Sequence, residues 1–128
     1  MRRAIVDTSV LIAAEQGRIL RHGIPDEIAV SVVTLAELEV GVLVAEDDDV
    51  RATRLSTLLA VRESADGLPA DAPVASAYAR LAAASLRAGR RPRVHDTWIA
   101  ATAAVHDAAV WTQDDDFGHF EGVEVVRV

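Results

Sequence analysis

The chain has 128 residues, a length typical of one compact domain, and 51% of them are hydrophobic, which is enough to bury a core. It contains no cysteine, and arginine supplies all of its 13 lysine-plus-arginine residues. The composition therefore excludes disulfides, thiolate metal sites and cysteine nucleophiles, and the lack of lysine excludes P-loop and Schiff-base chemistry. The net charge of −7 argues against a DNA reader with a basic face, although it is compatible with an enzyme that approaches nucleic acid through a metal ion.

Hydrophobic patterning predicts strands that alternate with helices along the chain. Strands are expected at residues 3–7, 27–32, 109–112 and 123–127, with a short extended piece at 67–69. Helices are expected at residues 8–22 (in one or two pieces, ending near Gly23 and Pro25), 34–46, 49–64, 72–88 and 95–107. A short turn or a single helical turn would connect the last two strands. This alternation predicts an α/β fold with a mainly parallel central sheet flanked by helices.

Nothing in the sequence divides the chain or directs it to a membrane. We find no internal repeat, low-complexity tract or linker, so one domain over residues 1–128 is expected. The apolar runs are too short for a membrane helix, and the first strand contains too few apolar residues for a signal peptide. We therefore expect a cytoplasmic protein without a membrane partner.

Acidic residues stand at positions that a parallel sheet would bring together. Asp7 ends the first strand, and Glu37 lies in the first turns of the helix after the second strand. Asp96 opens the helix before the strand at 109–112, and Asp114 follows that strand. Because ligands of such sheets bind beyond the carboxyl ends of the strands, we expect these carboxylates at one edge.

Each of these acids also has a purely structural explanation. Asp7 and Asp96 suit helix caps or helix N-termini, Glu37 completes a capping box with Thr34, and Asp114 suits a solvated loop. Taken one at a time, Glu37 and Asp114 favour the structural explanation. For Asp7 and Asp96 the structural and the functional explanations are equally good. Jointly it weakens, because clustered carboxylates repel one another and need a cation or shifted pKa values. An all-oxygen site suits Mg²⁺, with Mn²⁺ as a substitute, and predicts metal-assisted phosphodiester hydrolysis.

A group of arginines precedes Asp96 in the segment RAGRRPR at residues 87–93. The ordinary explanation is a solvated loop that closes a helix with arginine at its C-terminus. The alternative is that Arg90, Arg91 and Arg93 guide RNA phosphates to the metal, which we favour because the segment adjoins a candidate site residue. His95, by contrast, is expected to have a surface or packing role.

Four short stretches occur in an order and at spacings that are typical of one family. They are IVDTSVLIA (5–13), SVVTLAELEVG (31–41), HDTWIAATA (95–103) and WTQDDDF (111–117), and together they span almost the whole chain. In these stretches the sequence resembles the PIN domain, and most closely the VapC toxin ribonucleases of bacterial toxin–antitoxin modules. The resemblance implies helices around a parallel sheet and a Mg²⁺-dependent endoribonuclease.

The resemblance also implies roles for individual residues. Catalytic and metal-binding roles fall on Asp7, Glu37, Asp96 and Asp114, with Asp116 as a further metal-ligand candidate from the family pattern Thr-x-Asp-x-Asp-Phe. The family's supporting hydroxyls fall on Thr8 or Ser9 and on Thr112, where either could hold a metal-bound water, whereas Asp115 is expected to be solvated. The implied partners are an RNA substrate and a VapB-type antitoxin. Apolar faces on the helices at 8–22 and 34–46 would accept the antitoxin and support a homodimer.

Three other classes of protein compete with this interpretation. A phosphate-receiving signalling domain requires a lysine near its aspartate, and this chain has none. A haloacid-dehalogenase-like phosphatase requires a second Asp where this chain has Ser9. A PIN fold retained as a catalytically silent RNA-binding or scaffold module stays open as an alternative, although the complete set of acids argues against it.

Overall fold

The computed structural model of the chain describes residues 3–18 and 27–128. The strands within these residues are β1 (Ala4–Val6), β2 (Ile28–Ser31), β3 (Asp66–Leu68), β4 (Ala109–Thr112) and β5 (Val125–Arg127). The helices are α1 (Thr8–Glu15), α2 (Val32–Leu43), α3 (Asp48–Ser64), α4 (Ala72–Arg87) and α5 (Val94–Val105). The extended piece expected at 67–69 is a strand of the sheet, and an irregular turn-containing segment connects β4 to β5.

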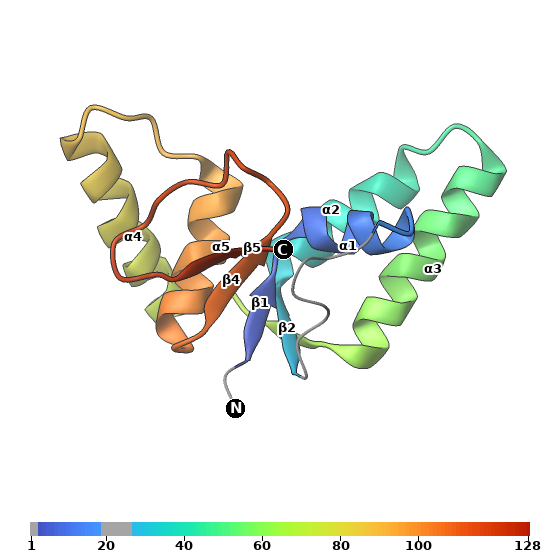
Figure 1. Cartoon of the computed structure of the whole chain (residues 1–128), viewed down its shortest axis with the longest axis horizontal. Coiled ribbons are helices and arrows are strands. Elements are labelled where there is room, and N and C mark those ends of the chain that lie inside the picture. The colour runs from blue at the N-terminus through green and yellow to red at the C-terminus, as the bar shows by residue number, and fades with distance from the viewer. Residues whose placement is uncertain (1–2, 19–26) are drawn as a thin grey trace.

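The strands form one sheet in the order β3-β2-β1-β4-β5, and every neighbouring pair is parallel. The predicted α/β fold is therefore confirmed, with a sheet that is parallel throughout. β1 lies at the centre, so the residue that follows it, Asp7, stands at the middle of the carboxyl edge of the sheet. The same edge receives the segments that follow β2 and β4 (Figure 1).

Helices cover both faces of this sheet. α4 and α5 pack on one face, and α1, α2 and α3 pack on the other (Figure 1). Alternate residues of each strand serve the two cores: Ile5 packs with the α4–α5 side, whereas its neighbour Val6 packs with the α1–α3 side. Burial on both faces explains why the strands are continuously apolar rather than alternating.

The ends of two helices differ from the prediction for local reasons. α2 begins at Val32 instead of residue 34, because Ser31 is its N-cap and accepts the Val33 N–H at 3.1 Å. The alternative explanation of Glu37, a capping box with Thr34, is therefore wrong, since both residues lie inside the helix. α1 ends at Glu15 where Gly17 turns the chain with a φ of 71°. The predicted continuation of this helix over 19–22 and its end near Gly23 and Pro25 lie outside the described residues.

The remaining bounds are close to the prediction. α5 covers Val94–Val105 where a helix was expected at 95–107, and β4 has the bounds predicted for it. In the part of the chain that the structure describes, no helix is both long enough and apolar enough to cross a membrane.

The buried start of α2 generates a test of stability. Thr34 is fully buried, and its Oγ1 has no hydrogen-bond partner among the described residues. Thr34→Val removes the unpaired hydroxyl at nearly constant shape, so we expect the free energy of unfolding in urea to rise by about 1 kcal/mol. Thr102→Val is the control, because that buried hydroxyl donates to the Trp98 carbonyl at 2.8 Å and its loss should destabilise. Equal destabilisation by both changes would contradict this account.

Candidate active site

An open cleft of about 840 Å³ lies at the carboxyl edge of the sheet. Its walls come from the β1–α1 junction, from α2, from the start of α5 and from the segment after β4. The carboxylates predicted to meet here all line it, and they are Asp7, Glu37, Asp96 and Asp114. The parallel sheet thus brings together acids that are up to 107 positions apart in the sequence, from Asp7 to Asp114.

Asp7 is the deepest of these acids, with 7% of its surface exposed. One oxygen, Oδ2, accepts hydrogen bonds from Ser9 Oγ at 2.9 Å and from Thr112 Oγ1 at 2.7 Å. Asp7 occupies the N-cap position of α1, yet its side chain makes no capping hydrogen bond. Helix capping therefore does not explain this residue. The two hydroxyls, both predicted as supporting groups, instead hold the carboxylate in place.

Glu37 is held by a different pair of side chains. Its Oε1 accepts a hydrogen bond from Thr8 Oγ1 at 3.1 Å, and its Oε2 lies 3.6 Å from His95 Nδ1. Thr8 belongs to α1 and His95 to α5, so this carboxylate is the point where three helices meet at the cleft. Only a surface or packing role was predicted for His95 from the sequence, although its position beside Asp96 at a helix start could have indicated the contact.

Asp96 lies on the first turn of α5 with 15% of its side chain exposed. The pKa of its carboxyl is raised from 3.8 to about 6, mainly by burial and additionally by the negative charges of Asp7, Asp114 and Glu37. Arg93 acts in the opposite direction, because its Nε lies 3.2 Å from Asp96 Oδ2. This contact is an ion pair without hydrogen-bond alignment, since Oδ2 has no hydrogen-bond partner within the described residues.

The turn after β4 positions Asp114 through the main chain. Asp114 Oδ1 accepts the N–H of Asp116 at 2.8 Å, and the N–H of Asp114 donates to Thr112 Oγ1 at 3.0 Å. Asp116, the further metal-ligand candidate, contributes backbone groups: its carbonyl also accepts a hydrogen bond from Arg93, and the described lining of the cleft does not include it. The side chain of Asp115 is 97% exposed, as expected of a solvated residue.

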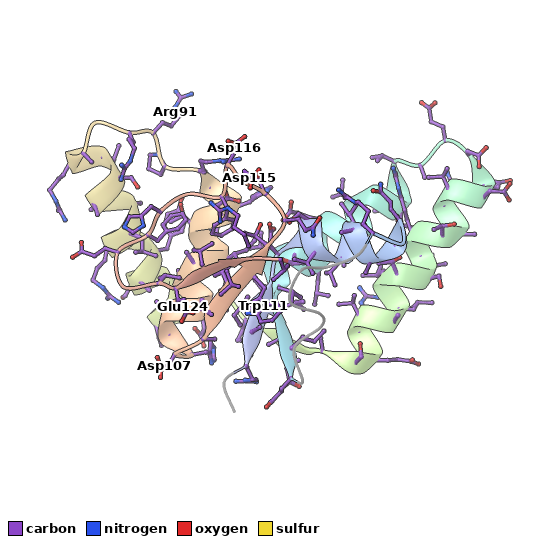
Figure 2. The ribbon with its side chains drawn as sticks, viewed as in Figure 1. Arg91, Asp107, Trp111, Asp115, Asp116 and Glu124 are labelled. Carbon is purple, nitrogen blue, oxygen red and sulfur yellow. The ribbon has the colours of Figure 1, made fainter. Side chains whose placement is uncertain are left out.

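The arginines before α5 differ in whether they line the acidic cleft. Arg93 turns into the cleft, where its guanidinium contacts Asp96 and lies 3.8 Å from Asp114 Oδ2. Arg91 lines the cleft as well, and Figure 2 shows it projecting outward at the end of the molecule where Asp115 and Asp116 lie. Arg90 does not line the cleft; it lines a hollow formed with residues 118–120. The sequence predicted one role for these three arginines; they line this hollow together, but only Arg91 and Arg93 also line the cleft.

The donor set of the cleft fits a hard divalent cation, because all of its acidic groups offer carboxylate oxygens. The buried Oδ2 of Asp96 also lacks a hydrogen bond that would otherwise satisfy it. Across residues 3–18 and 27–128, however, no three Asp, Glu, His or Cys side chains are grouped closely enough to hold an ion as they are placed. Arg93 supplies positive charge between Asp96 and Asp114 in this arrangement.

Comparison with known proteins decides the family of this chain. The sequence profile of the PIN domain matches residues 4–123. The chain belongs to the PIN-domain family. This PIN domain is 50% identical to ribonuclease VapC5 of Mycobacterium tuberculosis, over 97% of this chain and 94% of the relative. It is 42% identical to ribonuclease VapC4 of the same organism, over 100% of this chain and 98% of the relative.

Comparison of the three-dimensional structure leads to the same family. The chain superimposes with a TM-score of 0.88 on a chain from the crystal structure of VapBC-5, a member of the VapBC family of toxin–antitoxin systems from Mycobacterium tuberculosis. The two chains are 46% identical, and the match covers 100% of each. The resemblance stated from the four sequence stretches is therefore confirmed.

The environment of Asp96 predicts how pH affects the metal-free PIN domain. Because folding raises the pKa of this carboxyl from 3.8 to about 6, the folded state holds the proton more tightly than the unfolded chain does. The resulting stabilisation is complete below pH 3.8 and is lost as the pH rises through about 6. Asp96→Asn removes this dependence, so in EDTA at neutral pH it should be more stable than wild type, by at most about 3 kcal/mol.

Urea unfolding in EDTA at several pH values measures this difference, which should shrink toward low pH. Asp115→Asn is the matched control, because it removes the same charge from an exposed position whose contact with Arg127 is 3.6 Å long. An Asp96→Asn variant that is less stable than wild type at neutral pH would contradict the predicted penalty.

Proposed function

We propose that this PIN domain, as one unit over residues 1–128, is the ribonuclease toxin of a toxin–antitoxin pair and cleaves RNA in the cytoplasm. The observation that carries the proposal is the cleft where Asp7, Glu37, Asp96 and Asp114 meet, with burial and then the charges of the other three acids raising the pKa of Asp96. Carboxylates clustered in this way lower the stability of the fold, and such a cluster is typical of a site that binds a cation. The ribonuclease names of its relatives at 50% and 42% identity support the substrate class.

The residues proposed to hold Mg²⁺, or Mn²⁺ in its place, are Asp7, Glu37, Asp96 and Asp114. When bound, the ion would supply Lewis-acid polarisation of the scissile phosphodiester and a water of lowered pKa. Asp116 is the weakest candidate ligand, since its contribution to the cleft is through main-chain groups.

The other residues of the cleft would orient these acids. Ser9 and Thr112 fix Asp7 through its Oδ2, and Thr8 fixes Glu37 through its Oε1. Fixed ligands lower the cost of assembling the site when substrate arrives. Arg93 neutralises part of the acidic charge, and Arg91 at the rim of the same cleft is placed to contact an RNA phosphate.

An apolar groove beside the cleft suits the antitoxin. It measures about 550 Å³, lies between α2 and α5, and is lined by Val33, Val40 and Trp98 among others. Glu37 and His95 line both the groove and the acidic cleft. We propose that an antitoxin helix lies in this groove and extends a basic side chain, such as an arginine bound to two carboxylates, onto the acids. The relative in VapBC-5 comes from such a toxin–antitoxin system.

A second copy of the chain is the other proposed partner. α2 continues beyond the groove with exposed apolar side chains, among them Leu43 at its last position. Exposed apolar surface of this kind is common at symmetric interfaces, so a homodimer is proposed as the assembly.

The nuclease proposal predicts metal-dependent cleavage of RNA by the purified protein. Activity should require Mg²⁺ or Mn²⁺, disappear in EDTA, and fall by about a hundredfold or more in Asp7→Asn and Asp96→Asn, because each change removes a carboxylate charge from the site. Glu37→Gln and Asp114→Asn should also lower it, whereas Asp115→Asn should retain it. Calorimetric titration with Mn²⁺ provides a readout that is independent of cleavage.

Two results would count against this proposal. Undiminished cleavage in EDTA would exclude the metal mechanism. Folded wild-type protein that binds Mn²⁺ and RNA without cutting RNA would favour the silent RNA-binding or scaffold alternative.

The antitoxin proposal predicts that the groove and the cleft are covered together. Co-expression with the adjacent upstream gene should yield a soluble complex and suppress toxicity. Val40→Glu places a charge in the exposed apolar groove, so it should weaken the complex at least tenfold while cleavage by the free enzyme persists. Leu59→Glu on exposed α3 is the matched control. Equal weakening by both variants, or by neither, would exclude this groove as the docking site.

A further inference from the structure

Arg91 and Arg93 line the acidic cleft and also a second, smaller hollow of about 160 Å³. On its far side this hollow is lined by Ser85, Arg90, Gly118 and His119. A neighbouring hollow of about 270 Å³ shares Ser85, Arg90 and His119 with it. The two guanidinium groups at 91 and 93 therefore stand between an acidic site and a basic one.

Two of the three arginines that line this hollow have no ion pair within the described residues, whereas Arg93 is paired with the acids of the cleft. Arg90 and Arg91 are exposed, and neither makes an ion pair with any residue that the structure describes. Arg80 and Arg87 of α4 are likewise without an ion pair among the described residues, but they do not line this hollow as Arg90 and Arg91 do. In a chain with a net charge of −7, Arg90 and Arg91 leave positive charge available to an anionic ligand beside the acidic cleft.

The backbone around Arg90 is fixed. α4 ends at Arg87, and Gly89 reverses the chain with a φ of 75°. The N–H of Arg90 then donates to the Ser85 carbonyl at 2.9 Å, which ties the residue to the end of the helix. Opposite it, Gly118 lets the main chain lie close to the Phe120 ring, because a Cβ there would be 3.2 Å from that ring. One wall of the hollow is therefore a turn hydrogen-bonded to the end of α4, and the other packs closely on Phe120.

We propose that this hollow is a second phosphate subsite for RNA, in which Arg90 and His119 bind a phosphate on one side of the scissile bond. The proposal rests on the function proposed above and adds the path of the strand. The carboxylates of the cleft repel every RNA phosphate whose charge is not offset by a cation in the cleft. Affinity for the rest of the strand must therefore come from basic groups nearby. Arg91, which lines both sites, contacts the strand as it passes from one to the other.

The test uses binding of a single-stranded oligouridylate about twelve nucleotides long, with every protein carrying Asp7→Asn so that RNA stays intact. Arg90→Gln should lower the slope of log Kd against log salt by about 0.7, the value for one lost phosphate contact on a single strand. His119→Gln should also weaken binding of the oligouridylate. The dinucleotide UpU has a single phosphodiester and cannot occupy both sites at once, so its binding at the acidic cleft should be unchanged in both variants.

Arg80→Gln is the matched control, because Arg80 is an exposed arginine of α4 that does not line the hollow. A smaller change of slope in Arg80→Gln supports the subsite. An equal change in Arg80→Gln and Arg90→Gln, or an equal loss of UpU binding, overturns it. Both arginines are exposed, so loss of folding is not expected, and thermal unfolding verifies this.

Failure of the subsite can be distinguished from failure of the nuclease proposal. Wild-type protein that cleaves RNA in Mg²⁺, combined with an unchanged slope in Arg90→Gln, rejects the subsite alone. Wild-type protein that binds RNA without cleaving it, combined with the expected change of slope, rejects the nuclease proposal and retains the subsite.

Discussion

Carboxylates that repel one another surround a single cleft because every strand of the sheet runs in the same direction. Parallel strands end at one edge, so the segments after β1, β2 and β4 and the start of α5 all open there. The cost of this concentration of charge is visible at Asp96, whose pKa is raised to about 6 by burial and by the other three acids. Hydrophobic packing on both faces of the sheet must hold this edge together against the repulsion.

Polar contacts limit that cost without removing it. Asp7 receives two hydroxyl hydrogen bonds, Glu37 receives one, and Arg93 lies against Asp96 and near Asp114. These contacts orient the acids while leaving Asp96 Oδ2 without a hydrogen bond within the described residues. A site that is oriented but incompletely neutralised retains affinity for a further cation, which is the physical basis of the proposed metal dependence.

The three features around the acids share residues, so occupation of one affects the others. Glu37 and His95 line both the acidic cleft and the apolar groove between α2 and α5, whereas Arg91 and Arg93 line both the cleft and the basic hollow. A protein partner in the groove and an RNA strand over the hollow would thus approach the acids from different elements. An inhibiting protein and the RNA would then both act on the same carboxylates.

Much of this architecture was predictable from the sequence. Apolar runs of strand length alternating with helical periodicity predicted the parallel α/β fold, and the position of Asp7 after a buried strand predicted an acid at the sheet edge. The four spaced stretches predicted the PIN domain. Such features are local, or depend only on the order of the elements, so they can be predicted without knowing how the helices and strands pack.

Other features were decided by tertiary contacts. The spacing of Thr34 and Glu37 matches a capping box, but α2 begins earlier because Ser31 at the end of β2 caps it. Arg90 and Arg93 look equivalent in the sequence, and both line the hollow beside residues 118–120, yet only Arg93 contacts the acids. The sequence by itself determined the order of the elements and the identity of the acids. The contacts of Thr112 with Asp7, and of Thr8 and His95 with Glu37, were decided only by the tertiary structure, because they join separate segments whose approach depends on how the helices pack.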